Sequence, residues 1–272
     1  YMTHKLFDLS GKVSIVSGAA QGMGKEMSIG FAEAGSDVIL VDINNIGAED
    51  TANDISKLGV NCIVVKCDVS DSTQVLDLYK TVDKKFNKID IVANVAGPGG
   101  PTAPPAELDI SQLEKVVNAL VIGRFVSCQE AGKRMIKNGK GSIINFGSIG
   151  GWSSLGRGHT AYGMSMGATI QMTRELSTEW ASKGVRVNAI LPAQVWNSGL
   201  RERIKNVPEL EETFIGGIPM GRLGEPHEIK GPAIFLASDA SSFVTGAILP
   251  MDGGNLALNA GGTYPGSPRV YA

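Results

Sequence analysis

A glycine-rich segment near the start of the chain most strongly constrains its fold. Residues 17–24 read SGAAQGMG, between an apolar run and an amphipathic stretch. Glycines at this spacing permit a tight turn, let the backbone approach a pyrophosphate and let a helix lie close to a sheet. The amino end of that helix offers free N–H groups and a partial positive charge. A plain glycine turn is the alternative, but the pattern favours a strand, loop and helix that bind a dinucleotide through Ser17, Gly18, Gln21, Gly22, Met23 and Gly24.

Short apolar runs alternate with amphipathic stretches through the rest of the chain. Because the runs are too apolar to face water, we expect an α/β fold, with a doubly wound, Rossmann-like parallel sheet covered by helices on both faces. A length of 272 residues suits one such domain, with residues 256–272 as a C-terminal arm rich in glycine and proline. The pattern predicts about seven strands, at residues 12–18, 37–42, 61–68, 89–97, 141–148, 185–192 and 246–254. It predicts helices at residues 24–35, 47–59, 72–87, 110–139 and 160–184.

Composition excludes several classes of partner. The net charge of −2 gives no basic excess for nucleic acid or an anionic membrane. No apolar run reaches the length of about 18 residues that indicates a membrane-spanning helix, and the first residues lack the apolar core of a signal peptide. The three cysteines are few and odd in number, which favours the reducing cytoplasm, and no paired Cys/His spacing indicates a metal site.

Asp42 ends the second predicted strand, where it can select the cofactor. A carboxylate at this place accepts hydrogen bonds from a ribose 2′-hydroxyl and repels a 2′-phosphate. No arginine or lysine occurs in residues 19–23 or 43–47 to bind that phosphate. The alternative is a solvated aspartate at a strand end, but we predict that NAD is the cofactor rather than NADP.

Taken in order, these segments resemble the classical short-chain dehydrogenase/reductase family over about residues 7–255. SGAAQGMG is similar to the family's glycine motif, ANVAG to its Asn-Asn-Ala-Gly segment, and LPAQV to its Pro-Gly segment with alanine for glycine. The resemblance implies further cofactor contacts, from Ile43, Cys67, Asp68, Val69, Asn94, Ala96, Gly97, Tyr162, Pro192 and Val195.

The same resemblance implies hydride transfer between an alcohol and the nicotinamide ring. Such a reaction needs a partner for the hydroxyl proton, and a tyrosine such as Tyr162 is suited to it. Ser148 can hydrogen-bond the same substrate oxygen and hold it in place. Asn118 is expected to match the family's helix asparagine, which holds a water molecule in a proton relay.

Position 166 departs from the family, because Met166 stands where the motif Tyr-x-x-x-Lys has lysine. A free tyrosine has a pKa of about 10, and a nearby cation lowers it; methionine has no charge. Met166 is either an ordinary core residue, an engineered replacement of lysine, a feature of a weakened natural enzyme, or a mark of a non-catalytic NAD-binding protein. We expect the chain to bind NAD and to turn over slowly.

The substrate pocket is expected to be polar, with lining from residues 150–152, 155–159 and 193–200. Arg157 is a candidate for gripping a carboxylate, although a surface arginine is an equal alternative. The chain is similar to gluconate 5-dehydrogenase-like and 2-deoxygluconate 3-dehydrogenase-like members, which implies a polyol, a sugar acid or a related small hydroxylated substrate. A 3-oxoacyl-carrier-protein reductase-like enzyme is the alternative, and the family also implies a homotetramer. The expected substrate contacts are Ser148, Gly150, Arg157, Tyr162 and Gln194.

Overall fold

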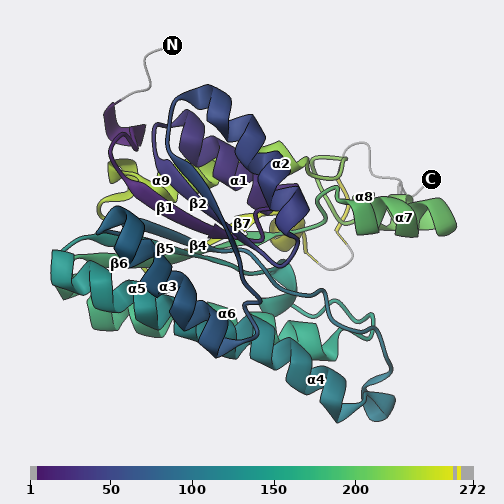
Figure 1. The fold of residues 1–272 in the computed structure, drawn as a ribbon. Helices are drawn as coiled ribbons and strands as arrows, with labels where there is room; N and C mark the ends of the chain where they lie inside the picture. Colours follow the sequence, from purple (N-terminus) through teal and green to yellow (C-terminus); the bar gives the residue numbers. More distant parts are fainter. Residues whose placement is uncertain (1–4, 260–261, 265–272) are drawn as a thin grey trace.

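The computed structural model describes residues 5–259 and 262–264. A seven-stranded, wholly parallel sheet in the order β3-β2-β1-β4-β5-β6-β7 forms its centre (Figure 1). The reversal of order between β1 and β4 creates a crevice at the carboxyl ends of the strands, where such sheets bind ligands. The strands are β1 (Val13–Ser17), β2 (Asp37–Asp42), β3 (Cys62–Lys66), β4 (Ile91–Asn94), β5 (Gly141–Phe146), β6 (Val185–Pro192) and β7 (Ile248–Met251).

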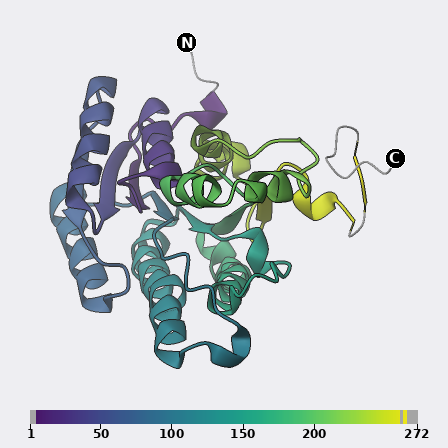
Figure 2. The same ribbon diagram turned by 90° about the vertical axis from the view of Figure 1, so that its right-hand side faces the viewer.

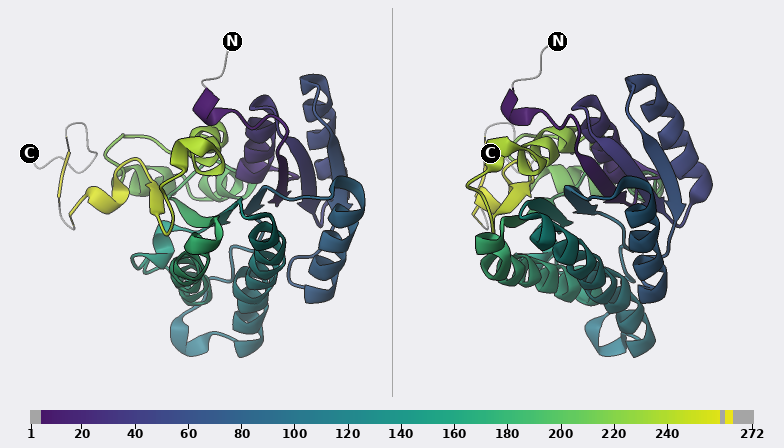
Figure 3. Two further views of the ribbon diagram at one scale, coloured as in Figure 1. Left: turned by 90° about the vertical axis from the view of Figure 1, so that its left-hand side faces the viewer. Right: turned by 60° about the vertical axis from the view of Figure 1, so that its left-hand side comes forward.

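Helices cover both faces of the sheet and make three layers (Figures 1, 2 and 3). One face carries α1 (Gly22–Glu33), α2 (Asn45–Ile55) and α9 (Lys230–Ala237). The other carries α3 (Ser72–Phe86), α5 (Arg124–Asn138) and α6 (Thr160–Trp180). Three further helices, α4 (Ile110–Val117), α7 (Ser198–Asn206) and α8 (Glu209–Ile215), project past the sheet on one side (Figure 1). Among the described residues, no helix is both long and apolar enough to cross a lipid bilayer.

Alternation along the strands builds two separate hydrophobic cores. In β2, Val38 and Leu40 pack with the α1 side chain of Phe31, whereas Ile39 and Val41 pack on the opposite face with Tyr79 of α3. Successive strand residues point to opposite faces, so both faces are apolar only when helices cover both. Each such side chain gains about 1.5–3 kcal/mol from burial.

The single-domain fold and all seven predicted strands are confirmed. The helix expected over residues 110–139 is interrupted, because a π-helical turn, Asn118–Gly123, separates α4 from α5. At its end Gly123 lies so close to the Val69 carbonyl oxygen that a β-carbon would collide with it. The sequence pattern did not predict α7, α8 or α9. Of the expected C-terminal arm, residues 260–261 and 265–272 lie outside the described residues, while the Tyr264 hydroxyl donates to the Ile215 carbonyl at 2.6 Å.

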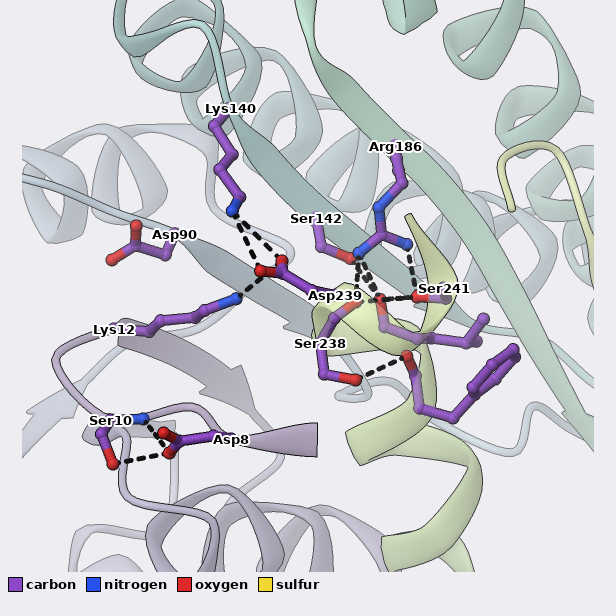
Figure 4. Close-up of polar contacts among 12 residues, drawn as sticks. Asp8, Ser10, Lys12, Asp90, Lys140, Ser142, Arg186, Ser238, Asp239 and Ser241 are labelled. Atoms are coloured by element: carbon purple, nitrogen blue, oxygen red, sulfur yellow. Dashed lines mark hydrogen bonds and ion pairs between the residues drawn. The ribbon is translucent and has the colours of Figure 1, made fainter. Parts of the chain in front are cut away.

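Polar contacts connect segments at the amino ends of the strands (Figure 4). Asp239, just after α9, pairs with Lys12 at 3.4 Å and Lys140 at 3.1 Å, which precede β1 and β5. Arg186 at the start of β6 donates to the Ser241 hydroxyl at 2.7 Å and to the Leu236 carbonyl at 2.9 Å. These contacts hold the segment after α9 against the amino ends of β1, β5 and β6.

Candidate active site

A cavity of about 990 Å³ opens at the carboxyl ends of β1, β2 and β4. The loop after β1 forms part of it, and Gly18 and Gly22 there have φ of 77° and 55°, in the left-handed region that favours glycine. A β-carbon on Gly24 would collide with the Gly18 carbonyl oxygen, so α1 can start only with glycine at that place. This cradle suits a pyrophosphate, as predicted. The predicted cofactor residues that line the cavity are Gly18, Gln21, Gly22, Met23, Gly24, Asp42, Ile43, Cys67, Asp68, Val69, Ala96 and Gly97.

Ser17 and Asn94 lie beneath this cavity rather than on its wall. The Ser17 hydroxyl accepts hydrogen bonds from the Val95 and Ala96 N–H groups at 3.1 and 3.2 Å. The Asn94 amide donates to Asn145 at 3.1 Å and its oxygen accepts from Ser127 at 2.7 Å. The structure therefore shows both residues fastening the ends of β1, β4 and β5, which supports the cavity from below.

Asp42 is held rigidly at the end of the cavity formed by β2. One carboxylate oxygen accepts from the Ala20 N–H at 3.0 Å and the other from the Asn44 N–H at 2.8 Å. Cys67 lines the cavity nearby, and burial raises the pKa of its thiol to about 11, so it stays neutral near neutral pH. Asp42 is therefore a fixed negative charge on this part of the wall, which Asp68 also lines.

A second cavity of about 490 Å³ holds the two predicted catalytic groups, Ser148 and Tyr162. Ser148 follows β5, and its hydroxyl accepts from the Gly150 N–H at 3.1 Å. Tyr162 lies in the first turn of α6. Burial raises the pKa of Tyr162, while a hydrogen bond with Ser148 and the charge of Arg124 act to lower it. Met23, Phe146 and Asn197 line both cavities, so a cofactor in the first would have its reactive end beside Tyr162.

Four more predicted residues line this second cavity: Arg157, Pro192, Gln194 and Val195. Pro192 and Val195, expected to touch the cofactor, thus lie on the substrate side of the site. Gly150 faces a neighbouring groove with Trp152 instead.

Sequence reasoning missed Arg203 of α7 and Phe214 of α8, which complete the wall of the second cavity. Because α7 carries several charged side chains, its sequence alone gives no signal that Arg203, among them, faces a pocket.

Met166 is 2% exposed and lies in an apolar cluster with Val116, Leu120 and Ala161, on which the Tyr162 ring packs. It lines neither cavity. Asn118 is exposed to solvent and lines neither cavity, so the structure does not bring it to Tyr162. The side chain from that helical turn that reaches the cluster is Leu120. The surroundings of Met166 are therefore apolar, and Asn118, expected to hold the water of a proton relay, faces solvent.

Within the described part of the chain, no group of three or more His, Cys, Asp or Glu side chains forms a metal-binding arrangement.

Comparisons with known proteins agree with this geometry. A family model described as "Enoyl-(Acyl carrier protein) reductase" matches residues 18–255. A 2-dehydro-3-deoxy-D-gluconate 5-dehydrogenase of Pseudoalteromonas atlantica is 40% identical over 253 residues, which cover 91% of this chain and 97% of the relative.

Two solved structures have the same fold. A proposed 2-deoxy-D-gluconate 3-dehydrogenase of Agrobacterium tumefaciens, with bound NADP, has a TM-score of 0.86 and 28% identity, covering 93% of this chain and 100% of its own. A 7α-hydroxysteroid dehydrogenase in complex with NADH and 7-oxo-glycochenodeoxycholic acid has a TM-score of 0.88 and 32% identity, covering 93% and 98%. With the glycine cradle, the Ser148–Tyr162 pair and the seven-stranded sheet, these matches show that the chain belongs to the short-chain dehydrogenase/reductase family of nicotinamide-dependent oxidoreductases.

Proposed function

We propose that this protein is an NAD-dependent dehydrogenase that interconverts a secondary alcohol and a ketone on a small hydroxylated anion, such as a sugar acid. The observation that carries the proposal is a basic wall, Arg157, His159 and Arg203, in the cavity that holds Ser148 and Tyr162. Burial and the charges of both arginines lower the pKa of His159, so the imidazole stays neutral and the two guanidinium groups carry the charge. Two cations beside a reacting hydroxyl suit a substrate carboxylate.

Two buried polar atoms favour a substrate with several hydroxyl groups. His159 Nδ1 and Gln194 Oε1 have no hydrogen-bond partner within the described residues, and both side chains line the cavity. An unpaired buried polar atom costs about 1–3 kcal/mol, which a ligand hydroxyl would recover. A polyol or sugar acid offers such groups on adjacent carbons.

The two catalytic side chains divide the work. The nicotinamide ring, when bound, accepts or gives the hydride. The Tyr162 hydroxyl takes the proton of the substrate alcohol during oxidation and returns it during reduction, while Ser148 holds the same oxygen by a hydrogen bond. Asp42 lines the cofactor cavity, and its carboxylate can accept from a ribose 2′-hydroxyl, which supports NAD over NADP. With Met166 in an apolar cluster, we expect turnover to be slower than with a lysine at that position.

A substrate screen tests this proposal. NADH formation is measured with sugar acids and with the polyols that differ from them only in having a hydroxymethyl group for the carboxylate. We expect the acids to be preferred, and Arg157→Ala with Arg203→Ala to raise KM for acids by about tenfold or more while leaving polyols unchanged. Arg174→Ala is the control, because Arg174 stacks on the Trp152 ring outside the cavity. Equal turnover of acids and polyols would contradict an anionic substrate.

Assembly as a homotetramer is part of the proposal. Ile122, Phe125 and Met164, on the π-helical turn, α5 and α6, are 47%, 41% and 58% exposed. Exposed apolar side chains on two adjacent helices favour a subunit interface. Light scattering at micromolar concentration tests it, and a monomeric mass would remove it. The three cysteines are free, which supports a cytoplasmic location.

A non-catalytic NAD-binding protein is the second candidate, favoured by the buried, uncharged Met166. It predicts NADH binding with no turnover of any substrate in the screen. A 3-oxoacyl-carrier-protein reductase-like activity remains the alternative enzyme, and reduction of an acetoacetyl thioester with NADH would support it.

A further inference from the structure

A buried arginine lies beneath the cofactor cavity. Arg124, the first residue of α5, is 4% exposed. Its Nη1 donates to the Phe146 carbonyl at 2.8 Å and the Thr169 hydroxyl at 3.0 Å, and its Nη2 donates to the Ala96 carbonyl at 3.3 Å. All three acceptors are uncharged.

No carboxylate compensates this charge. Among the described residues, one other charged side chain is buried: Glu130, 7% exposed, which pairs with Lys133 and Arg134. No acidic group contributes to the electrostatic surroundings of Arg124, where only the Cys128 thiol and the Tyr162 phenol oppose the effect of burial. A buried cation without a counter-ion is costly. A buried charge of this kind near a candidate catalytic site is a reason to look for a functional role.

The Arg124 guanidinium contacts segments that also line the two cavities or carry Tyr162. Phe146 lines both cavities and lies two residues before Ser148. Thr169 lies on α6, seven residues after Tyr162. On the cofactor side, a β-carbon on Gly97 would lie 4.0 Å from Arg124 Nη2. The cation therefore lies behind the wall on which the cofactor and the tyrosine would meet.

The side of Tyr162 that faces position 166 has no charge. Tyr162 packs on the cluster of Val116, Leu120, Ala161 and Met166, and none of the buried polar atoms that lack a partner in the described chain belongs to this cluster. Methionine fits these apolar surroundings, so a positive charge for Tyr162 has to come from a residue outside the cluster. Among the described residues, Arg124 is the one whose charge lowers the pKa of Tyr162.

We propose that Arg124 is a positioning residue that supplies, from beneath the cofactor cavity, the positive charge that favours ionised Tyr162 in place of a lysine at position 166. The proposal rests on the proposed function, in which Tyr162 exchanges the substrate proton. Arg124 itself transfers no proton, because burial lowers its pKa only to about 10 and the guanidinium stays charged near neutral pH. Burial raises the pKa of the neighbouring Cys128 to about 12, so that thiol stays neutral.

Direct titration of Tyr162 tests this without any substrate. The ultraviolet absorbance of tyrosinate is followed against pH, and the signal of Tyr162→Phe is subtracted to isolate Tyr162. In Arg124→Gln, which keeps an amide donor for the nearby carbonyls but loses the charge, we expect the pKa of Tyr162 to rise by about one unit or more. Arg124→Lys should restore it. Equal values in all three proteins would overturn the proposal.

A matched control separates charge from structure. Arg186 is also partly buried and donates to the Leu236 and Ser238 carbonyls. It lies at the amino ends of the strands, whereas the site lies at their carboxyl ends. Arg186→Gln should lower thermal stability without moving the pKa of Tyr162. If Arg124→Gln does not fold, Arg124→Met provides a second neutral variant for the same titration, with melting curves recorded for each protein.

Kinetics supply an independent readout. With a substrate from the screen, Arg124→Gln should lower kcat by about 10–100-fold near neutral pH, shift the kcat profile to higher pH, and change KM less than about threefold. Met166→Lys should raise kcat more in the Arg124→Gln protein than in the unaltered protein. Strictly additive effects would show that the two positions do not act on one group. Full turnover by the Tyr162→Phe protein would refute the proposed function itself. If Tyr162→Phe is inactive but Arg124→Gln leaves the pKa of Tyr162 unchanged, only the role of Arg124 is refuted.

Discussion

The fixed carboxylate of Asp42 makes the choice of cofactor a quantitative prediction. Asp42 lines the cofactor cavity, and the N–H groups of Ala20 and Asn44 hold both of its oxygens. Asp42→Asn keeps the size of the side chain and removes the charge. We therefore expect this single change to alter the relative affinities for NADH and NADPH, with the loss of one of the two N–H hydrogen bonds, because an amide has a single acceptor oxygen.

The magnitude follows from two interactions that both favour NADH. Two unit charges about 4 Å apart interact by about 1 kcal/mol in water and about 4 kcal/mol near a protein surface. For a half-buried carboxylate, repulsion of a 2′-phosphate is then about 2 kcal/mol, or roughly 30-fold in NADPH affinity. A hydrogen bond from the ribose 2′-hydroxyl to a charged group adds about 1.5 kcal/mol for NADH, or roughly tenfold. The unaltered protein should prefer NADH by a few hundredfold.

The assay is a fluorescence titration of both reduced cofactors at one fixed ionic strength. In Asp42→Asn we expect NADPH to bind about 30-fold more tightly and NADH up to tenfold more weakly. Asp54→Asn is the matched control, because Asp54 pairs with Lys25 at 2.8 Å and does not line the cavity, so the same change in net charge should leave both affinities unaltered. Equal affinities of the unaltered protein for NADH and NADPH would refute the reasoning.

Three further predictions follow from other parts of the molecule. Tyr162→Phe should lower kcat by about 10²–10⁴-fold with an unchanged Kd for NADH, and stopped-flow measurement of turnover beside the fluorescence titration checks both. Leu120→Ala should lower the free energy of unfolding by about 2–5 kcal/mol, whereas Leu120→Met should cost less than about 1.5 kcal/mol; urea denaturation measures the difference, and equal costs would mean that the cluster around Met166 is loosely packed. Hydrogen bonds from Arg222 and from the Glu225 N–H lower the pKa of Glu228 from 4.5 to about 2. A carboxyl group whose pKa is depressed in the folded state stabilises that state above pH 4.5, and this stabilisation is lost as the pH falls towards 2. The Tm difference between the unaltered protein and Glu228→Gln should therefore shrink over that range. A constant Tm difference would contradict the assignment.

The regular part of the fold could be predicted because its signal is local. In β2, both Val38 and Ile39 are apolar although they point to opposite faces, and that pattern alone requires helices on both sides. The glycine cradle was predictable for a related reason, since Gly24 can be nothing larger while α1 packs on the Gly18 carbonyl. Such residues are fixed by sterics between neighbours in the chain.

The missing parts of the site depend on contacts between distant segments. Arg203 lines the cavity together with residues at and after the ends of β5 and β6, which are distant in the chain, and nothing in its own helix distinguishes it from solvated charges. Asn118 was expected in the site from its place in a motif, but the π-helical turn that begins there presents Leu120 to the cluster instead. Helical phase over such a turn cannot be read from a regular periodicity, because the turn adds to the number of residues per repeat.

Arg124 did carry a signal in the sequence, because it is the lone charge in the apolar stretch ALVIGRFV. A charge there must either reach solvent or bind buried oxygens, and the structure shows the second, on the Phe146, Ala96 and Thr169 oxygens. Replacing one lysine by methionine in a site built for lysine would leave polar atoms without partners around position 166. Instead Met166 and Leu120 lie in one apolar cluster, and the charge of Arg124 acts to lower the pKa of Tyr162. On the proposal made above, the apolar cluster and the buried arginine act together on Tyr162. Effects of Met166→Lys and Arg124→Gln on kcat that are not additive would support this, and strictly additive effects would contradict it.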